Sequence, residues 1–142
     1  INTHSISEDL GERLILIADD SAVARNQVKR ALEGLGVKMH LVMNGREALH
    51  YLQDVAKSCN ESVTEKIGLL ISDIEMPEMD GYTLTAEIKA NPALRQMHVV
   101  LHSSLSGVFN EAMVKKVGAD QFIAKFHPDE LVSAVQKWMQ AD

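Results

Sequence analysis

The chain lacks several features that mark whole classes of protein. It has one cysteine, Cys59, so no internal disulfide can form, and a reducing cytoplasm is the expected location. No apolar run approaches the roughly 20 residues that span a bilayer, and no signal-peptide pattern opens the chain, so no membrane insertion is expected. The net charge is -6 and there is no long basic run, which argues against nucleic-acid binding. No Gly-x-Gly-x-x-Gly motif follows a strand, which excludes dinucleotide binding.

What is present is a fivefold alternation of short apolar runs with stretches of helical periodicity. Such alternation predicts an α/β fold with a parallel sheet, right-handed crossovers and helices on both faces. The third apolar run is centred on Leu69-Leu70-Ile71 and shows no polar alternation, which is typical of a strand covered on both faces. The predicted strands are residues 14–18, 37–43, 67–72, 98–103 and 122–125, and the predicted helices are residues 21–35, 45–55, 82–91, 109–117 and 128–139.

The 142 residues suit a single domain. Residues 1–12 are polar without a clear period and are interpreted as a tail or linker remnant, which leaves residues 13–140 as the domain. Because the chain starts with Ile1 rather than Met, we expect it to be a fragment of a longer protein. Residues 57–66 predict a polar surface loop, and the fourth helix is expected to bury a stripe of Phe109, Ala112, Met113 and Val117.

Polar side chains follow each predicted strand, where parallel strands bring their carboxyl ends to one edge of the sheet. They are Asp19-Asp20, Asn44, Asp73, Ser103-Ser104 and Lys125. Carboxylates this close repel by roughly 4 kcal/mol per pair at an effective dielectric of 20, so compensating positive charge is expected. Lys125 supplies one charge, and oxygen ligands without nearby His or Cys favour Mg²⁺ over zinc. A carboxylate that stays free to react could form an acyl phosphate.

These residues together resemble the receiver domain of two-component signalling, the CheY-like fold with strand order 2-1-3-4-5. The resemblance runs from about Arg13 to Gln140 and includes Asp73 with Met76-Pro77-x-x-Asp80-Gly81. The phrases Ile71-Ser-Asp-Ile-Glu-Met-Pro-Glu-Met-Asp-Gly-Tyr82 and Leu101-His-Ser-Ser-Leu-Ser-Gly-Val-Phe-Asn110 are closer still to the receiver half of CheV-type chemotaxis proteins. In those proteins a CheW-like coupling domain precedes the receiver.

The resemblance implies a signalling domain, and not an enzyme acting on a separate substrate, that accepts a phosphoryl group from a CheA-like histidine kinase and then switches a partner-binding surface. Asp73 would be the phosphoacceptor. Mg²⁺ would be held by Asp20, Asp73 and the backbone carbonyl of Glu75, with Asp19 acting through water. Ser103 and Lys125 would bind the phosphoryl group, and Phe122 occupies the position of the switching aromatic.

Two departures from the family pattern stand out. Ser104 occupies a position where Ala or Gly is usual, so it adds a hydroxyl beside the site. Lys125 is followed by Phe126 instead of proline, and Pro128 comes later. A cis bond before a non-proline residue costs about 2.5–4 kcal/mol, so we predict a trans Lys125–Phe126 bond with Lys125 still reaching Asp73.

Two other functions remain open from the residues alone. One is a binding module of the same fold that works without phosphorylation, which the intact acids, Ser103 and Lys125 disfavour. The other is a haloacid-dehalogenase-like phosphatase with an Asp nucleophile, whose first strand should end in Asp-x-Asp instead of the adjacent pair Asp19-Asp20.

Overall fold

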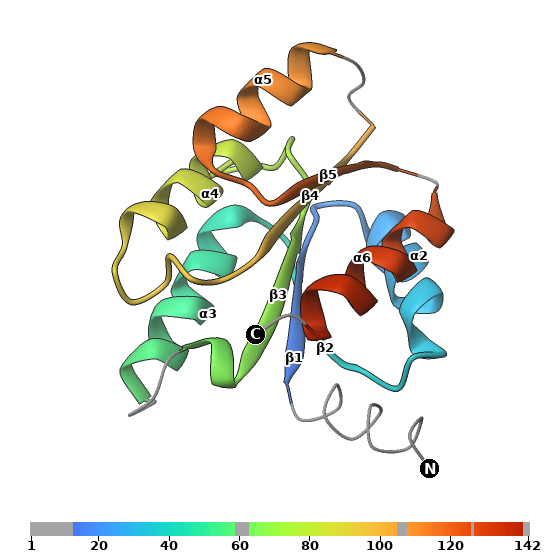
Figure 1. Ribbon diagram of the computed structural model, residues 1–142, viewed down its shortest axis with the longest axis horizontal. Helices are drawn as coiled ribbons and strands as arrows, with labels where there is room; N and C mark the ends of the chain where they lie inside the picture. Colours follow the sequence, from blue (N-terminus) through green and yellow to red (C-terminus); the bar gives the residue numbers. More distant parts are fainter. Residues whose placement is uncertain (1–12, 59–62, 105–107, 126, 141–142) are drawn as a thin grey trace.

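The computed structural model describes residues 13–58, 63–104, 108–125 and 127–140, which form a sheet covered by helices on both faces (Figure 1). The strands are β1 Leu14–Ala18, β2 Lys38–Val42, β3 Ile67–Ser72, β4 Val99–Ser103 and β5 Gln121–Ala124. The helices are α2 Ala22–Glu33, α3 Gly45–Ser58, α4 Gly81–Ala90, α5 Val108–Val117 and α6 Pro128–Gln140, with a short 3-10 helix, η1, at Val63–Glu65. Among these helices none is long and apolar enough to cross a membrane.

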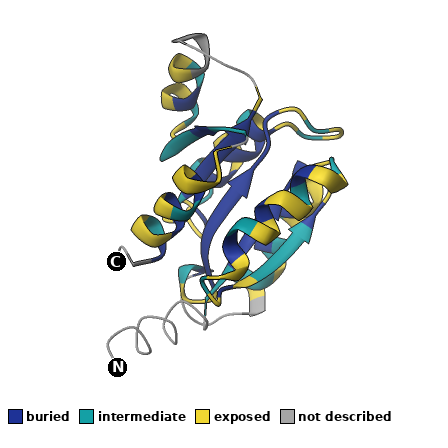
Figure 2. Ribbon diagram, turned by 90° about the vertical axis from the view of Figure 1, so that its right-hand side faces the viewer, coloured by how far each residue is buried: buried dark blue, intermediate teal, exposed yellow. Residues whose placement is uncertain are grey.

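The five strands form one parallel sheet in the order β2-β1-β3-β4-β5, which confirms the predicted fold. All six residues of β3 are buried, since this central strand has a neighbour on each side and helices on both faces (Figure 2). The edge strand β2 is mostly half-buried. The continuous apolar sequence of β3 and the more polar sequence of β2 follow from these positions.

Two hydrophobic clusters fill the two sides of the sheet. Ile17, Ile71 and Val100 pack against α2 and α6. Their strand neighbours Leu70 and Leu101 face the opposite side, towards α3, α4 and α5. Alternate residues of each strand therefore pack against helices on opposite faces of the sheet. The residue that follows each strand continues this alternation, which sets the face towards which its side chain points.

Two predictions about local structure were wrong. Residues 57–66 were predicted to be a polar surface loop, but α3 continues to Ser58 and Val63 in η1 is only 1% exposed, while residues 59–62 lie outside the described part of the chain. Among the side chains of α5 that the structure describes, Val114 is buried, Ala112 is exposed, and Met113 and Val117 are half-buried. In both segments the buried residue is set by the layer that packs over it rather than by the periodicity of the segment itself. The side chain of Phe109 lies outside the described residues.

Candidate phosphorylation site

The three acids lie at the carboxyl ends of two neighbouring strands. Asp19 and Asp20 follow β1, and Asp73 follows β3, whose last paired residues are Ala18 and Ser72. The ladder continues one step, because the Asp73 amide donates to the Ala18 carbonyl at 2.8 Å. One carboxylate oxygen from each acid lies within 4.8 Å of the others. The fold thus gathers three carboxylates from two distant parts of the sequence.

The ammonium group of Lys125 reaches this cluster from the carboxyl end of β5, the edge strand of the sheet. Lys125 follows β5 and its backbone amide donates to the Ser103 carbonyl at 2.9 Å, which fixes the end of β5 against β4. Its Nζ lies 3.0 Å from Asp19 Oδ2 and 3.5 Å from Asp73 Oδ1. The lysine is closer to Asp19 than to Asp73, so its charge is divided between the two acids. Burial lowers the pKa of Lys125, but hydrogen bonding to Asp19 and the charges of both acids outweigh this and raise it.

Burial is the main perturbation at Asp73. It raises the pKa of this carboxyl to about 6, with help from the Asp19 charge and against the opposing effects of Lys125 and the Ile74 amide. Both described contacts fall on one oxygen, since Oδ1 accepts the Ile74 amide at 2.9 Å and lies nearest Lys125. Among the described residues, Oδ2 has no such partner. Near pH 7 Asp73 is therefore mostly ionised, with one oxygen left to bind or react.

The charges in the cluster do not balance. Asp19 is buried and held by Lys125 and by the Ser21 amide at 2.9 Å from Oδ1. Asp20 is exposed, and its carboxylate forms no hydrogen bond or ion pair with the residues that the structure describes. Three carboxylates face one ammonium group, and the surplus of two negative charges matches a divalent cation. Oxygen-only donors in a partly open site fit Mg²⁺, which keeps some of its waters.

The loop between β3 and α4 is held tightly beneath the acids. Gly81 donates its amide to the Ile74 carbonyl at 2.8 Å, and a Cβ on Gly81 would lie 2.3 Å from the Asp73 carbonyl oxygen. Only glycine fits this approach. Asp80 is exposed, and its carboxylate caps α4 by accepting a hydrogen bond from the Thr83 amide at 2.7 Å. Glu75 is exposed within the same loop.

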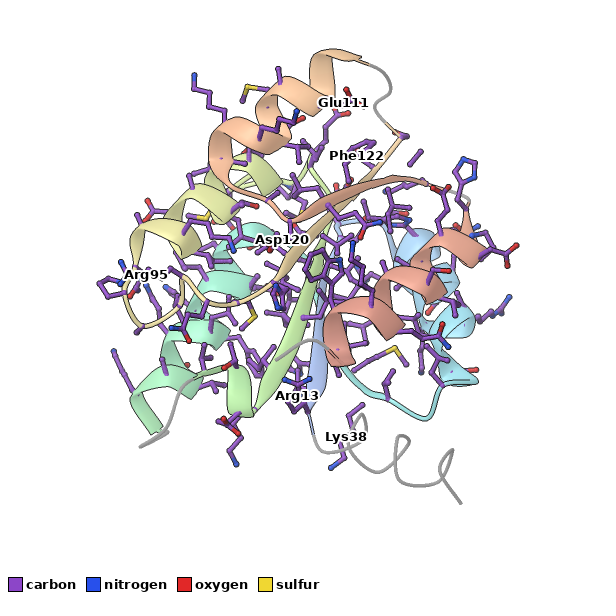
Figure 3. The ribbon with its side chains drawn as sticks, in the orientation of Figure 1. Arg13, Lys38, Arg95, Glu111, Asp120 and Phe122 are labelled. Atoms are coloured by element: carbon purple, nitrogen blue, oxygen red, sulfur yellow. The ribbon has the colours of Figure 1, made fainter. Side chains whose placement is uncertain are left out.

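The other residues singled out from the sequence surround the acids at varying distances. Ser103 is the last residue of β4 and is 1% exposed, whereas Ser104 is exposed. Phe122 in β5 is half-buried and packs against the cluster beneath α4 and α5 (Figure 3). Phe126 lies outside the described residues, so the predicted trans Lys125–Phe126 bond remains a prediction. Asn44 follows β2 and caps α3, where its Oδ1 accepts the Glu47 amide at 2.9 Å.

Sequence reasoning assigned no role to His102, which is the neighbour of the site on β4. It is 7% exposed and follows Val100 on the face towards α2 and α6. The last β3–β4 pair is Ser72 with Leu101, so one step further His102 stands beside Asp73. Burial, with the nearby charge of Lys125, lowers the pKa of His102 to about 4. The alternation of His102 with Val100 could have shown from the sequence that this imidazole faces inward.

Comparison with known proteins agrees with this geometry. The family model described as response regulator receiver domain matches residues 15–136. Chemotaxis protein CheV1 of Helicobacter pylori is 32% identical over 136 residues, covering 96% of this chain and 41% of that protein. The chain spans less than half the length of this and two further CheV relatives.

Solved structures give the same result for the fold. The receiver domain of a signal transduction histidine kinase from Syntrophus aciditrophicus has a TM-score of 0.75 at 33% identity, covering 92% of this chain and 95% of that one. The receiver domain of a sensor histidine kinase from Pseudomonas aeruginosa, solved with a magnesium ion in its active-site cleft, has a TM-score of 0.75 at 23% identity and covers 92% and 100% of the two chains. This chain therefore belongs to the response regulator receiver domain family of two-component signalling.

Proposed function

We propose that this chain is a chemotaxis receiver domain in which Asp73 accepts a phosphoryl group from a phosphohistidine of a CheA-like kinase. The observation that carries the proposal is the cluster of Asp19, Asp20 and Asp73, with the ammonium group of Lys125 lying 3.5 Å from Asp73. The likeness to CheV proteins supports chemotaxis as the pathway. The cytoplasm as location, residues 13–140 as the domain and an attached CheW-like coupling domain belong to the same proposal.

In the transfer, Asp73 Oδ2 attacks the phosphorus atom. The new O–P bond forms as the N–P bond of the phosphohistidine breaks, and the electron pair of that bond returns to the imidazole nitrogen. A bound Mg²⁺, held by Asp20, Asp73 and the Glu75 carbonyl with Asp19 acting through water, would neutralise charge on the phosphoryl oxygens. Lys125 pairs with another phosphoryl oxygen and the Ser103 hydroxyl donates to a third. Ser104, exposed beside Ser103, adds a further hydroxyl at the rim.

The signal would leave the site through β4 and β5. A phosphoryl group on Asp73 draws Ser103 towards it, and Phe122 repacks against the residues beneath α5, among them Val114. A local change of charge thereby selects one of two packings and alters a partner-binding surface. Amide exchange should change between Ser103 and Phe122 on phosphorylation. A change confined to Asp19, Asp20 and Asp73 would contradict this route.

The test of the acceptor is an intact-mass measurement after incubation with acetyl phosphate and Mg²⁺. The parent should gain the mass of one phosphoryl group, and Asp73→Asn should gain none. Asp120→Asn is the matched control, because it removes a carboxylate at the other end of the sheet and should leave the gain unchanged. An equal gain in Asp73→Asn would refute the assignment, because another residue would then carry the phosphoryl group. No gain in the parent would favour a binding module of this fold that works without phosphorylation.

A further inference from the structure

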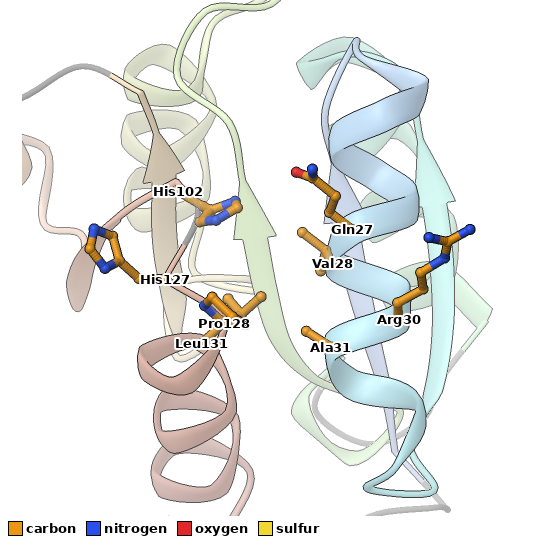
Figure 4. Close-up of a pocket in the computed structure, with 8 residues that line it drawn as sticks. All are labelled: Gln27, Val28, Arg30, Ala31, His102, His127, Pro128 and Leu131. Carbon is orange, nitrogen blue, oxygen red and sulfur yellow. The ribbon is translucent and has the colours of Figure 1, made fainter.

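A cavity of about 450 Å³ lies between α2 and α6, on the face of the sheet that carries His102. Aliphatic groups of Val28, Ala31, Pro128 and Leu131 form its two walls (Figure 4). This volume falls within the range of about 300–1,000 Å³ that is usual for small-molecule pockets, which combine apolar walls with a few polar groups.

The polar group at the floor of the cavity is the imidazole of His102. This side chain comes from β4 and points towards α2 in the close-up (Figure 4). It is more than nine-tenths buried, yet neither ring nitrogen hydrogen-bonds to any residue in the described part of the chain. Buried polar groups nearly always have a hydrogen-bond partner, because leaving one unsatisfied destabilises the fold. The imidazole thus presents an unused hydrogen-bonding capacity to the cavity.

The polar groups around His102 define the chemistry of an occupant. The Gln27 amide extends from α2 towards the same space as His102, whereas the Arg30 guanidinium points away from it (Figure 4). Burial keeps His102 neutral by lowering its pKa to about 4. A neutral imidazole has one N–H donor and one acceptor nitrogen. The aliphatic walls would solvate a charged occupant poorly, so an uncharged one is favoured.

We propose that the cavity between α2 and α6 is a binding site for a small, uncharged ring compound bearing an amide-like group. The ring packs between the aliphatic walls, and the amide, which can donate or accept, forms a hydrogen bond with one ring nitrogen of His102. This site does not depend on the proposed phosphorylation, because it can be assayed on the unphosphorylated chain without metal. His102 nevertheless lies beside Asp73 on the neighbouring strand, so an occupant would lie close to the proposed phosphoacceptor.

The experiment is a titration of the ¹⁵N-labelled chain, followed by amide chemical shifts, with benzamide as the probe and benzoate as its charged analogue. Benzamide should shift the amides of Val28, Ala31, His102 and Leu131, and benzoate should not. Ala31→Leu fills the cavity and should abolish these shifts. Ala86→Leu, the same change in the groove between α4 and α5, is the matched control and should bind as the parent does.

His102→Val retains a strand-forming residue and should weaken benzamide binding by about tenfold, the value of one hydrogen bond. The spectrum of each variant reports whether it is folded. If His102→Val does not fold, Ala31→Leu still tests the proposal. Three outcomes would overturn the proposal. They are absence of the benzamide shifts up to its solubility limit, equal shifts with benzoate, and undiminished binding by Ala31→Leu.

Discussion

Each end of the sheet carries acidic side chains that are buried or half-buried, and the two ends differ in how far these carboxylates are neutralised by neighbouring groups. At the amino ends of β4 and β5, Asp120 accepts the Val99 amide at 2.7 Å and pairs with Lys89 at 3.3 Å (Figure 3). His98 lies 3.8 Å from its other oxygen. At the carboxyl ends, three acids lie together, and the ammonium group of Lys125 pairs with two of them, Asp19 and Asp73.

The difference separates a structural carboxylate from a reactive one. One acid with one cation and a backbone donor is balanced, so Asp120 ties the strands together and needs nothing further. Three acids with one cation retain negative charge, and burial adds to the cost of ionising Asp73. Such a cluster costs stability in the absence of a cation, which is the usual sign of a site kept for function rather than for folding.

The largest expected effect is a gain of stability in Asp73→Asn. Because the folded-state pKa of Asp73 is raised from 3.8 to about 6, its ionisation penalises the fold at every pH above about 6. Asparagine removes that penalty, so unfolding in urea at pH 7 with EDTA should require about 3 kcal/mol more than for the parent. The gain should shrink as the pH falls below 6 and vanish near 4. A variant no more stable than the parent at pH 7 would contradict the charge surplus.

His102 should produce a pH dependence of similar size and opposite direction. Its folded-state pKa is lowered from 6.5 to about 4, so protonation of the unfolded chain destabilises the fold as the pH falls from 6.5 to 4. Relative to His102→Val, the parent should lose about 3 kcal/mol of unfolding free energy between pH 7 and pH 4. Urea unfolding of both proteins across this range tests it. Parallel curves would show that the imidazole is not held neutral.

Mg²⁺ should stabilise the fold by binding at the carboxyl end of the sheet. At a concentration one hundred times its dissociation constant, it should add about 2.7 kcal/mol to the unfolding free energy of the parent. Asp20→Asn removes an exposed ligand and should lose most of this gain, whereas Asp120→Asn should retain it. Thermal unfolding with and without Mg²⁺ measures both. Equal stabilisation of Asp20→Asn and the parent would remove Asp20 from the metal site.

The smallest expected effect is at the amino end. Asp120→Asn still accepts the Val99 amide but loses the pair with Lys89, and this pair is partly exposed. The variant should be less stable by about 1 kcal/mol, opposite in sign to Asp73→Asn. Urea unfolding at pH 7 in the same buffer checks it. A gain of stability here would mean that the two ends of the sheet do not differ as described.

Much of the fold could be predicted from the sequence, since each strand is a short apolar run and each helix has its own period. The buried run of β3 and the acids after β1 and β3 needed only the rule that parallel strands end at one edge. Val63 and Val114 could not be found in this way. A single apolar residue in a short segment is buried by whichever layer lies over it, and that layer is built from distant parts of the chain.

The site was partly predictable for the same reason. The strand ends bring Asp19, Asp73 and Lys125 together, but the closer pairing of Lys125 with Asp19 depends on side-chain conformations that no spacing encodes. His102 belongs to no sequence motif, and its place near the acids depends on which face of β4 it occupies. Its position beside Asp73 follows from register, which is a property of the assembled sheet.

The measurement that tests the account most directly is the rate of phosphoryl gain from acetyl phosphate, followed by mass, with Mg²⁺ and with EDTA. Peptide mapping of the product locates the phosphoryl group. The account predicts rapid gain on Asp73 that requires Mg²⁺ and is strongly slowed in Asp20→Asn. Gain at the same rate in EDTA would show that the acid cluster does not bind a cation needed for phosphorylation. A phosphoryl group mapped to Asp19 or Asp20 would show that Asp73 is not the acceptor.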